Sequence, residues 1–240
     1  MLVMVGSVAG CVATPPDRPD DPATAVLRID RSGGFGPLSA RYRVPALVVY
    51  GDGSAIVAGQ DQGAVFTARR RMLTDGELSG LFEQAARANL FEDNAYGLDV
   101  LDAASLSVRI RSTEGTFRTQ AGLQSETGGD DRRRIVEFAA AAEQVGTEAG
   151  EYAPDRYAVV VLAEAAGREP VRPWPLPVPP EQVPGWPARP CLEIDAAAAG
   201  DLLAAARSAD HQTSWRAGDR QVSLVIRPLL PDEPGCAALR

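Results

Sequence analysis

The stretch Leu47-Val48-Val49-Tyr50-Gly51-Asp52-Gly53-Ser54-Ala55-Ile56-Val57-Ala58-Gly59 decides how this chain is expected to fold. Its valines and tyrosine favour a pleated, half-buried strand. Gly51-Asp52-Gly53 supplies the positive φ angles that a tight turn needs. The sequence therefore predicts a β-hairpin here, with further strands and helices arranged around it.

Apolar and polar residues alternate on both sides of the hairpin and predict the other strands. Thr74-Asp75-Gly76-Glu77 has the spacing of a capping box, so a helix begins here and is expected to end near Asn89. A second helix is expected over residues 132–145, capped by Asp131, and a third from a cap at Asp195 to about Ala209. Strands are expected at 25–30, 64–68, 105–111, 116–120, 157–163, 191–194, 213–215 and 222–226.

These elements predict an α+β fold in which antiparallel sheets carry helices on one face. Residues 25–150 form an N-terminal half that ends at Gly146 to Gly150, and residues 151–240 form a C-terminal half. A crossover at 170–190 contains nine prolines, and we expect its Trp174 and Trp186 to hold it to the core. Both halves show strand, helix, strand, which indicates either a duplication or one domain with two similar parts.

The N-terminal residues have the pattern of an export signal. Val8-Ala9-Gly10-Cys11 fits the lipobox of bacterial lipoproteins, in which the cysteine receives lipid, and the apolar run before it is too short to span a membrane. The next residues are rich in Pro and Asp. We therefore expect 1–24 to be a lipoprotein signal and disordered tether, with the mature chain lipid-anchored outside the cytoplasm. The alternative is a chance apolar N-terminus with an ordinary cysteine.

Two cysteines remain once Cys11 carries lipid. Cys191 and Cys236 form an even pair, and export favours a disulfide between them. Their Cα atoms would come within about 4.4–6.8 Å if the neighbouring strands share a sheet. The alternative is two unpaired, buried thiols.

Charge and motifs limit the chemistry. The net charge of −8 argues against a nucleic-acid partner, and all 24 basic residues are arginine, which binds carboxylates bidentately. The sequence contains no phosphate loop and no Gly-x-Ser-x-Gly elbow. Its one histidine, His211, provides neither the ligand set of a zinc site nor a recognisable triad. We expect no metal and no cofactor.

A resemblance to known proteins supports export. Residues from about 29 to 120 resemble a bacterial domain of unknown function found in exported proteins, through the hairpin Val49 to Gly59, the helix start Thr74 to Glu77, the loop Tyr96 to Ala103 and the strand Leu106 to Ile110. The whole chain, with its ending Arg227-Pro228-Leu229-Leu230-Pro231-Asp232-Glu233 and Cys236, is similar to a group of actinobacterial hypothetical lipoproteins. The resemblance implies a lipid-anchored envelope protein and assigns no catalytic residues.

Two functions remain open. In the first, the chain is a non-catalytic envelope module that binds a ligand or a partner protein through its loops or the proline-rich crossover. In the second, it is an extracytoplasmic hydrolase that uses His211 or a pair of carboxylates, whose separation a sequence does not reveal. The missing catalytic motifs favour the first, and the sequence identifies no binding residues.

Overall fold

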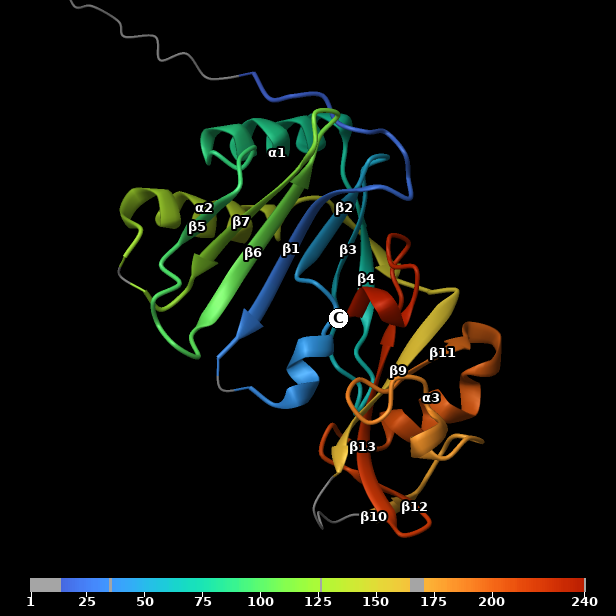
Figure 1. Cartoon of the computed structure of the whole chain (residues 1–240). Coiled ribbons are helices and arrows are strands. Elements are labelled where there is room, and N and C mark those ends of the chain that lie inside the picture. Colours follow the sequence, from blue (N-terminus) through green and yellow to red (C-terminus); the bar gives the residue numbers. More distant parts are fainter. Residues whose placement is uncertain (1–13, 35, 126, 165–170, 240) are drawn as a thin grey trace, which may run out of the picture.

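Two β-sheets and three α-helices form the part of the chain that the computed structural model describes, residues 14–34, 36–125, 127–164 and 171–239 (Figure 1). The strands are β1 (Ala25–Gly33), β2 (Leu47–Tyr50), β3 (Ser54–Ala58), β4 (Ala68–Met72), β5 (Asn94–Tyr96), β6 (Ala104–Arg111), β7 (Thr116–Gly122), β8 (Thr147–Glu151), β9 (Arg156–Glu164), β10 (Val171–Pro173), β11 (Cys191–Asp195), β12 (Ser214–Ala217) and β13 (Arg220–Pro228). The helices are α1 (Asp75–Arg87), α2 (Gly129–Ala142) and α3 (Gly200–Arg207).

The larger sheet has the strand order β5-β7-β6-β1-β2-β3-β4-β8, and the smaller sheet has the order β10-β12-β13-β9-β11. The pairs β5·β7 and β10·β12 are parallel and the other named pairs are antiparallel. The predicted α+β fold is therefore confirmed.

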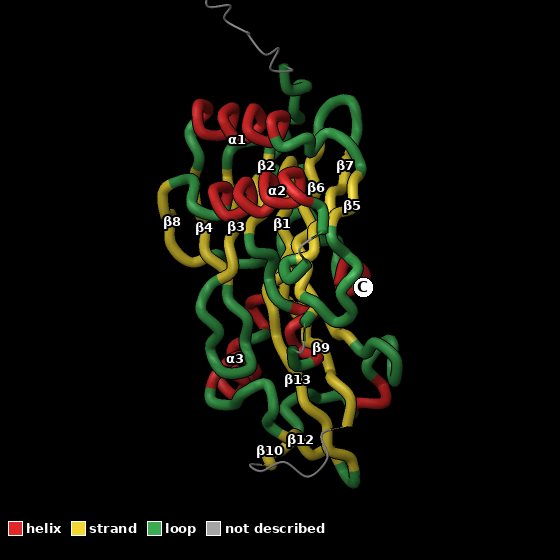
Figure 2. The backbone as a smooth tube through the Cα atoms, turned by 90° about the vertical axis from the view of Figure 1, so that its left-hand side faces the viewer, coloured by secondary structure: helices red, strands yellow, loops and turns green. Residues whose placement is uncertain are grey.

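Each sheet carries its helices on one face. Helices α1 and α2 cover one face of the larger sheet, where their apolar stripes meet Leu27 and Ile29 of β1 (Figure 2). Helix α3 lies on the outer face of the smaller sheet, packed with Val159 and Val161. The remaining faces of the two sheets meet in a third apolar cluster, so that they pack against each other. It contains Val44, Val48, Tyr50, Ile56, Phe66, Ala68, Val160, Leu162, Val225 and Leu230.

The hairpin and the first helix form as predicted. Strands β2 and β3 pair across the Gly51 to Gly53 turn, in which Gly53 has φ 81°. At the start of α1, the Thr74 hydroxyl accepts a hydrogen bond from the Glu77 N–H at 3.2 Å, and the Glu77 carboxylate accepts one from the Thr74 N–H at 2.7 Å. The predicted capping box is thus present.

Two strands lie where the sequence indicated something else. Of the segment predicted as a strand at 64–68, Val65 forms only isolated bridges and Ala68 is the first residue of β4, which runs on through three arginines. Gly146 to Gly150, expected to end the N-terminal half, contributes to β8, an edge strand whose residues are all exposed. Both strands lack the apolar alternation that reveals a half-buried strand.

Two predicted helix caps were wrong. Helix α2 begins at Gly129 after Gly128, which has φ 90°, and Asp131 lies inside its first turn. Asp195 precedes a single 3₁₀ turn, and α3 begins only at Gly200. A glycine with positive φ precedes α2, and a 3₁₀ turn precedes α3. A sequence pattern does not show at which residue such a turn ends and the α-helix begins.

The expected tether and the proline-rich crossover both touch the body of the protein. Within the described part of the tether, the Asp17 carbonyl accepts a hydrogen bond from the Thr113 N–H at 2.8 Å, and Asp21 closes a turn that leads into β1. Residues 17–24 are therefore packed against the first sheet. Trp174 and Trp186 lie against the core beneath α3, as expected for the crossover.

Hydrogen bonds and ion pairs link the two halves of the chain. Each sheet is built from one half of the chain, but Phe66 donates to the Ile226 carbonyl at 2.8 Å, and Ile226 donates to the Ala64 carbonyl at 2.9 Å. Residues Asp232 and Glu233 return from the C-terminal half to contact Arg28 of β1. Whether the halves arose by duplication stays a prediction. In the described chain, no helix has the length and apolar character needed to cross a membrane.

Candidate functional site

The face of the larger sheet that carries no helices has an apolar part and a polar part. Since side chains alternate along a strand, Arg28 and Asp30 point away from the helices while Leu27 and Ile29 point toward them. Over β2 and β3 this helix-free face is apolar and covered by the smaller sheet. Over β1, β6 and β7 it is polar and hollowed.

Three arginines stand in one row across that polar part. Arg28 on β1 is paired in register with Arg109 on β6, and Arg109 is paired with Arg118 on β7. Like charges directly opposite each other destabilise a sheet. The row therefore favours the binding of negatively charged groups close to it.

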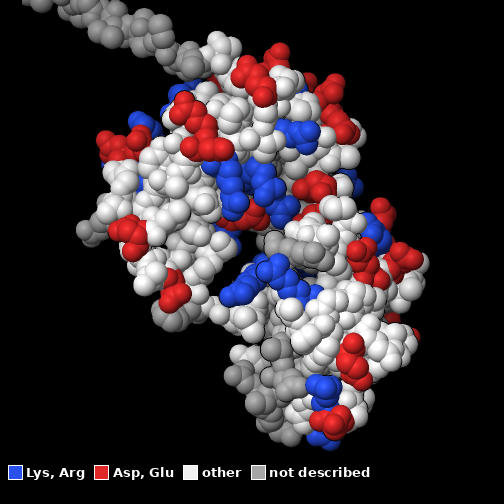
Figure 3. Space-filling view, viewed as in Figure 1, with Lys and Arg blue, Asp and Glu red and all other residues white. Residues whose placement is uncertain are grey.

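Opposite this row lies a second wall with three more arginines. Arg41 and Arg43 come from the 3₁₀ helix Leu38–Tyr42 and the residue after it, and Arg189 comes from the proline-rich crossover. The two walls enclose a cleft of about 480 Å³, and Figure 3 shows arginines gathered on both sides of a hollow near the middle of the molecule. We call it the arginine cleft. Its charged lining residues are Arg28, Arg41, Arg43, Arg109, Arg118, Arg189, Arg227, Asp30, Asp232 and Glu233.

The positive character of the arginine cleft contrasts with the rest of the protein. Seven arginines and three carboxylates line it, whereas the whole chain has 24 arginines against 32 acidic residues. Arg43 forms an ion pair with Asp61 at 2.7 Å. Within the described residues no ion pair reaches the other rim arginines, which are Arg41, Arg109, Arg118 and Arg189.

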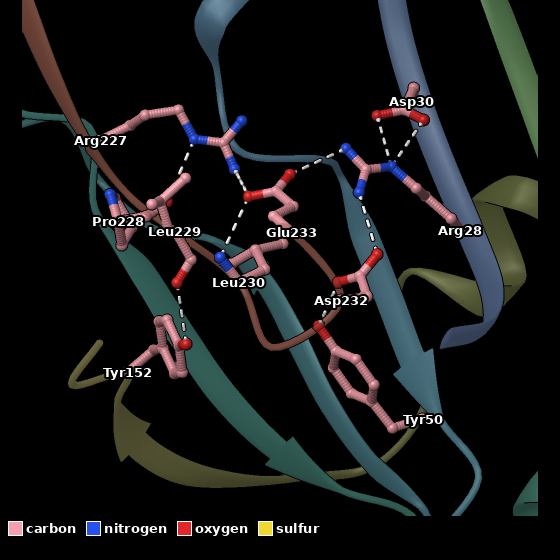
Figure 4. A network of polar contacts seen from close by, with 10 residues as sticks. All are labelled: Arg28, Asp30, Tyr50, Tyr152, Arg227, Pro228, Leu229, Leu230, Asp232 and Glu233. Carbon is pink, nitrogen blue, oxygen red and sulfur yellow. Dashed lines mark hydrogen bonds and ion pairs between the residues drawn. The ribbon is translucent and has the colours of Figure 1, made fainter. Parts of the chain in front are cut away.

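At the base of the cleft, carboxylates bind the remaining two arginines (Figure 4). The Glu233 carboxylate accepts hydrogen bonds from Arg227 at 2.6 Å, from Arg28 at 3.2 Å and from the Leu230 N–H at 3.0 Å. Asp232 accepts from Arg28 at 3.3 Å. The two acidic residues thus join β1 of the larger sheet to β13 of the smaller one.

Burial shapes the ionisation of this network. Burial lowers the pKa of the Arg227 guanidinium, although Glu233 opposes that effect. For Arg28, burial alone would lower the pKa, but Asp30, Glu233 and Asp232 outweigh it and raise the pKa above its ordinary value. The charged form of Arg28 is therefore strongly held by the protein's own carboxylates.

Two tyrosines complete the network. Tyr50 donates its hydroxyl hydrogen to Asp232 at 2.8 Å, and Tyr152 donates to the Leu229 carbonyl at 3.0 Å. Burial, reinforced by Asp232, raises the pKa of Tyr50, and burial with nearby acidic groups raises the pKa of Tyr152 to about 12. Both phenols therefore act as hydrogen-bond donors at neutral pH.

The two predicted disulfide cysteines lie together. The Cα atoms of Cys191 and Cys236 are 5.9 Å apart and their sulfur atoms are at bonding distance. The Cys236 N–H also donates to Glu193 at 2.9 Å. This holds the turn Cys236–Leu239 in place, and its Ala238 and Leu239 line the arginine cleft. Cys11, the predicted lipidation site, lies outside the described residues.

His211 lies next to a carboxylate other than its chain neighbour. Its Nε2 is 3.6 Å from Asp61, and its ring packs on Phe66 with 4.9 Å between centroids. Asp210 instead accepts hydrogen bonds from Gln212 and Thr213 in its own turn. Asp61 is shared with Arg43. Asp61 thus has Arg43 and His211 as neighbours beside the Phe66 ring, and no hydroxyl or thiol of the described chain forms a hydrogen bond with His211.

The acidic residues offer little for hydrolysis. In the arginine cleft, Asp30, Asp232 and Glu233 each accept hydrogen bonds from Arg28. Arg28 therefore occupies oxygen atoms of all three carboxylates. No set of three or more His, Cys, Asp or Glu side chains in the described residues could hold a metal ion.

The sequence did not identify the arginine cleft. Arg28 and Arg109 occupy solvent-side positions of predicted strands, a pattern that is ordinary for any half-exposed sheet. Only the strand register places them opposite each other and next to Arg118. Comparison with models of protein families, with curated proteins and with solved structures found no match to this chain.

Proposed function

We propose that this protein is a non-catalytic cell-envelope lipoprotein that binds an anionic ligand in the arginine cleft. The observation that carries the proposal is the row of Arg28, Arg109 and Arg118 in direct register across three strands. Arg28 is already bound by Asp30, Asp232 and Glu233, which leaves Arg109 and Arg118 for an external anion. If the ligand is a partner protein in the envelope, that protein carries the anionic group that Arg109 and Arg118 bind.

Guanidinium groups suit this task. Each presents several N–H donors in a plane and binds carboxylate or phosphate oxygens in pairs. The row brings two such groups side by side on neighbouring strands, about 5 Å apart at the backbone. The Ser107 hydroxyl oxygen accepts a hydrogen bond from the Arg118 Nε–H at 3.2 Å and adds a hydroxyl to the same surface. The cleft can therefore surround one anionic group from several sides.

The proposed location rests on the N-terminal sequence. The lipobox ending at Cys11 supports lipidation there and anchoring at the outer side of the cell membrane. Intact-mass analysis of protein from the membrane fraction should show a diacylglycerol group on Cys11. An unlipidated chain that still carries residues 1–10 would count against anchoring, while leaving ligand binding to be judged separately.

Binding is tested by removing charge from the row. The variant Arg109→Gln/Arg118→Gln and the control Arg133→Gln/Arg134→Gln, which removes two exposed arginines from α2, are titrated calorimetrically with inorganic phosphate and with citrate. Since a charge-assisted hydrogen bond contributes about 1.5–3 kcal/mol, the first variant should bind at least about tenfold more weakly than the wild type. The control should bind like the wild type.

Stability separates a binding role from a structural one. Arg109 and Arg118 face like charge, so their removal should leave the free energy of unfolding unchanged or raise it by up to about 1 kcal/mol. Absence of binding to either probe by the wild type refutes the proposal. So does equal binding by both double variants. The hydrolase hypothesis has less support, because no hydroxyl or thiol of the described chain is hydrogen-bonded to His211 and the cleft carboxylates are each bound by Arg28.

A further inference from the structure

A second hollow continues the arginine cleft along β6. It has a volume of about 330 Å³ and shares Arg28, Arg109 and Asp232 with the arginine cleft. Its far end is lined by Arg111 and Thr116, where β6 turns into β7. The shared residues place the two hollows next to each other on the polar face of the sheet, and we call the two together the groove.

Positive charge recurs along this groove. Arg109 and Arg111 are two residues apart on β6, which separates their Cα atoms by about 7 Å along the strand. Arg109 and Arg118 are cross-strand neighbours about 5 Å apart. Like Arg41, Arg109, Arg118 and Arg189, Arg111 forms no ion pair within 4.0 Å of a described residue, although Asp21 attracts it from farther away. Five arginines without a close ion pair to a described residue therefore follow the groove, namely Arg41, Arg109, Arg111, Arg118 and Arg189.

The lining also indicates the kind of anion. Hydroxyls of Ser32, Ser107 and Thr116 stand among the arginines and can donate to phosphate oxygens. The one aromatic lining side chain among the described residues is Tyr42, and the apolar ones are few. Protein interfaces depend on buried aromatic or aliphatic anchors, and single-stranded nucleic acid depends on stacking platforms. Neither feature is developed here.

We propose that the groove binds a linear, phosphate-bearing polyanion along its length, with separate phosphates at the Arg111 end, on the Arg109–Arg118 row and between Arg41 and Arg189. This inference rests on the proposed function, because it assigns the ligand class of the same cleft. A compact anion would fill one part of the groove and leave the other arginines without a counter-charge. A chain with repeated charge satisfies all of them at once.

The test uses the full chain with Cys11→Ser and inorganic polyphosphates of increasing length. Affinity is measured by calorimetry for phosphate, tripolyphosphate and a chain of about 15 phosphates, and is normalised per phosphate. We expect at least a tenfold gain from tripolyphosphate to the long chain, with binding that weakens steeply as salt rises because counterions are released. Arg111→Gln should weaken the long chain at least threefold more than it weakens phosphate, whereas Arg133→Gln should affect neither.

Several outcomes would overturn the inference. Equal normalised affinity for phosphate and the long chain would indicate a small-anion site, and the proposed function would survive. Binding of polyglutamate, single-stranded DNA or phosphatidylglycerol vesicles without binding of soluble polyphosphate would identify a protein, a nucleic acid or a lipid surface as the ligand. Absence of binding to any of these anions would refute both the inference and the proposed function.

Discussion

Glu233→Gln should be severely destabilising, because it removes the charge that holds Arg227. The two side chains are only 2–3% exposed, and the oxygen of Glu233 lies 2.6 Å from the guanidinium. Glutamine keeps the shape and can still accept the Leu230 N–H, but it leaves Arg227 buried with no other carboxylate in an ion pair among the described residues. Breaking a buried pair in this way costs about 3–5 kcal/mol.

The loss is measured by urea unfolding, followed through the fluorescence of the three tryptophans, of which Trp215 is buried in the smaller sheet. For a chain of this size the same loss lowers the melting temperature by about 6–20 °C. The matched control is Glu83→Gln, since Glu83 lies 3.9 Å from Arg87 in an exposed pair on α1. Its cost should stay below about 0.5 kcal/mol.

A companion variant tests the reason for the loss. Arg227→Met/Glu233→Met removes both buried charges, and Arg28 keeps Asp30 and Asp232 as partners. It should recover most of the stability that Glu233→Gln loses, because apolar replacement of a buried pair is often neutral. A cost for Glu233→Gln within about 1 kcal/mol of the Glu83→Gln control would refute the reasoning.

Two further predictions concern the same region. Reduction of the disulfide, or the variant Cys191→Ala/Cys236→Ala, should lower the unfolding free energy by about 4 kcal/mol, since the bridge closes a loop with a sequence separation of 45. Equal urea midpoints for oxidised and reduced protein would contradict this prediction. The double variant is the control, because its stability should not respond to reductant. The pKa of Tyr152 is raised to about 12, against about 10 for an unfolded tyrosine, so its contribution is complete below about pH 10 and lost as the pH rises toward 12. Tyr152→Phe should therefore reduce the fall of unfolding free energy between pH 10 and 12, and an unchanged fall would show that Tyr152 is not responsible.

Local patterns predicted much of the fold. The turn at Gly51 to Gly53, the capping box of Thr74 and Glu77 and the alternation along β6 depend on residues close in sequence, and each is present. The strands β4 and β8 were missed for a physical reason. They pair through backbone hydrogen bonds at one side of the sheet. Their side chains are mostly exposed and show no alternation of apolar and polar residues.

The candidate site could not be predicted in the same way. It depends on register between β1, β6 and β7, and on the return of residues 232 and 233 to β1. Register is a long-range property, and a shift by one residue would turn Arg109 toward the helices. The disulfide was easier to anticipate, because the chain has three cysteines and only two remain once Cys11 is expected to carry lipid.

The return of Asp232 and Glu233 to Arg28 has a consequence for the order of assembly. The contacts join positions separated by 204 and 205 residues, so Arg28 has Asp30 beside it on β1 but meets Asp232 and Glu233 only after nearly all of the described chain has been made. During synthesis the N-terminal half emerges first and would present the arginine row with Asp30 but without Asp232 and Glu233. A nascent chain stopped before residue 232 should therefore be markedly more prone to bind anions and to misassemble. The contacts of Arg28 with Asp232 and Glu233 form late in folding.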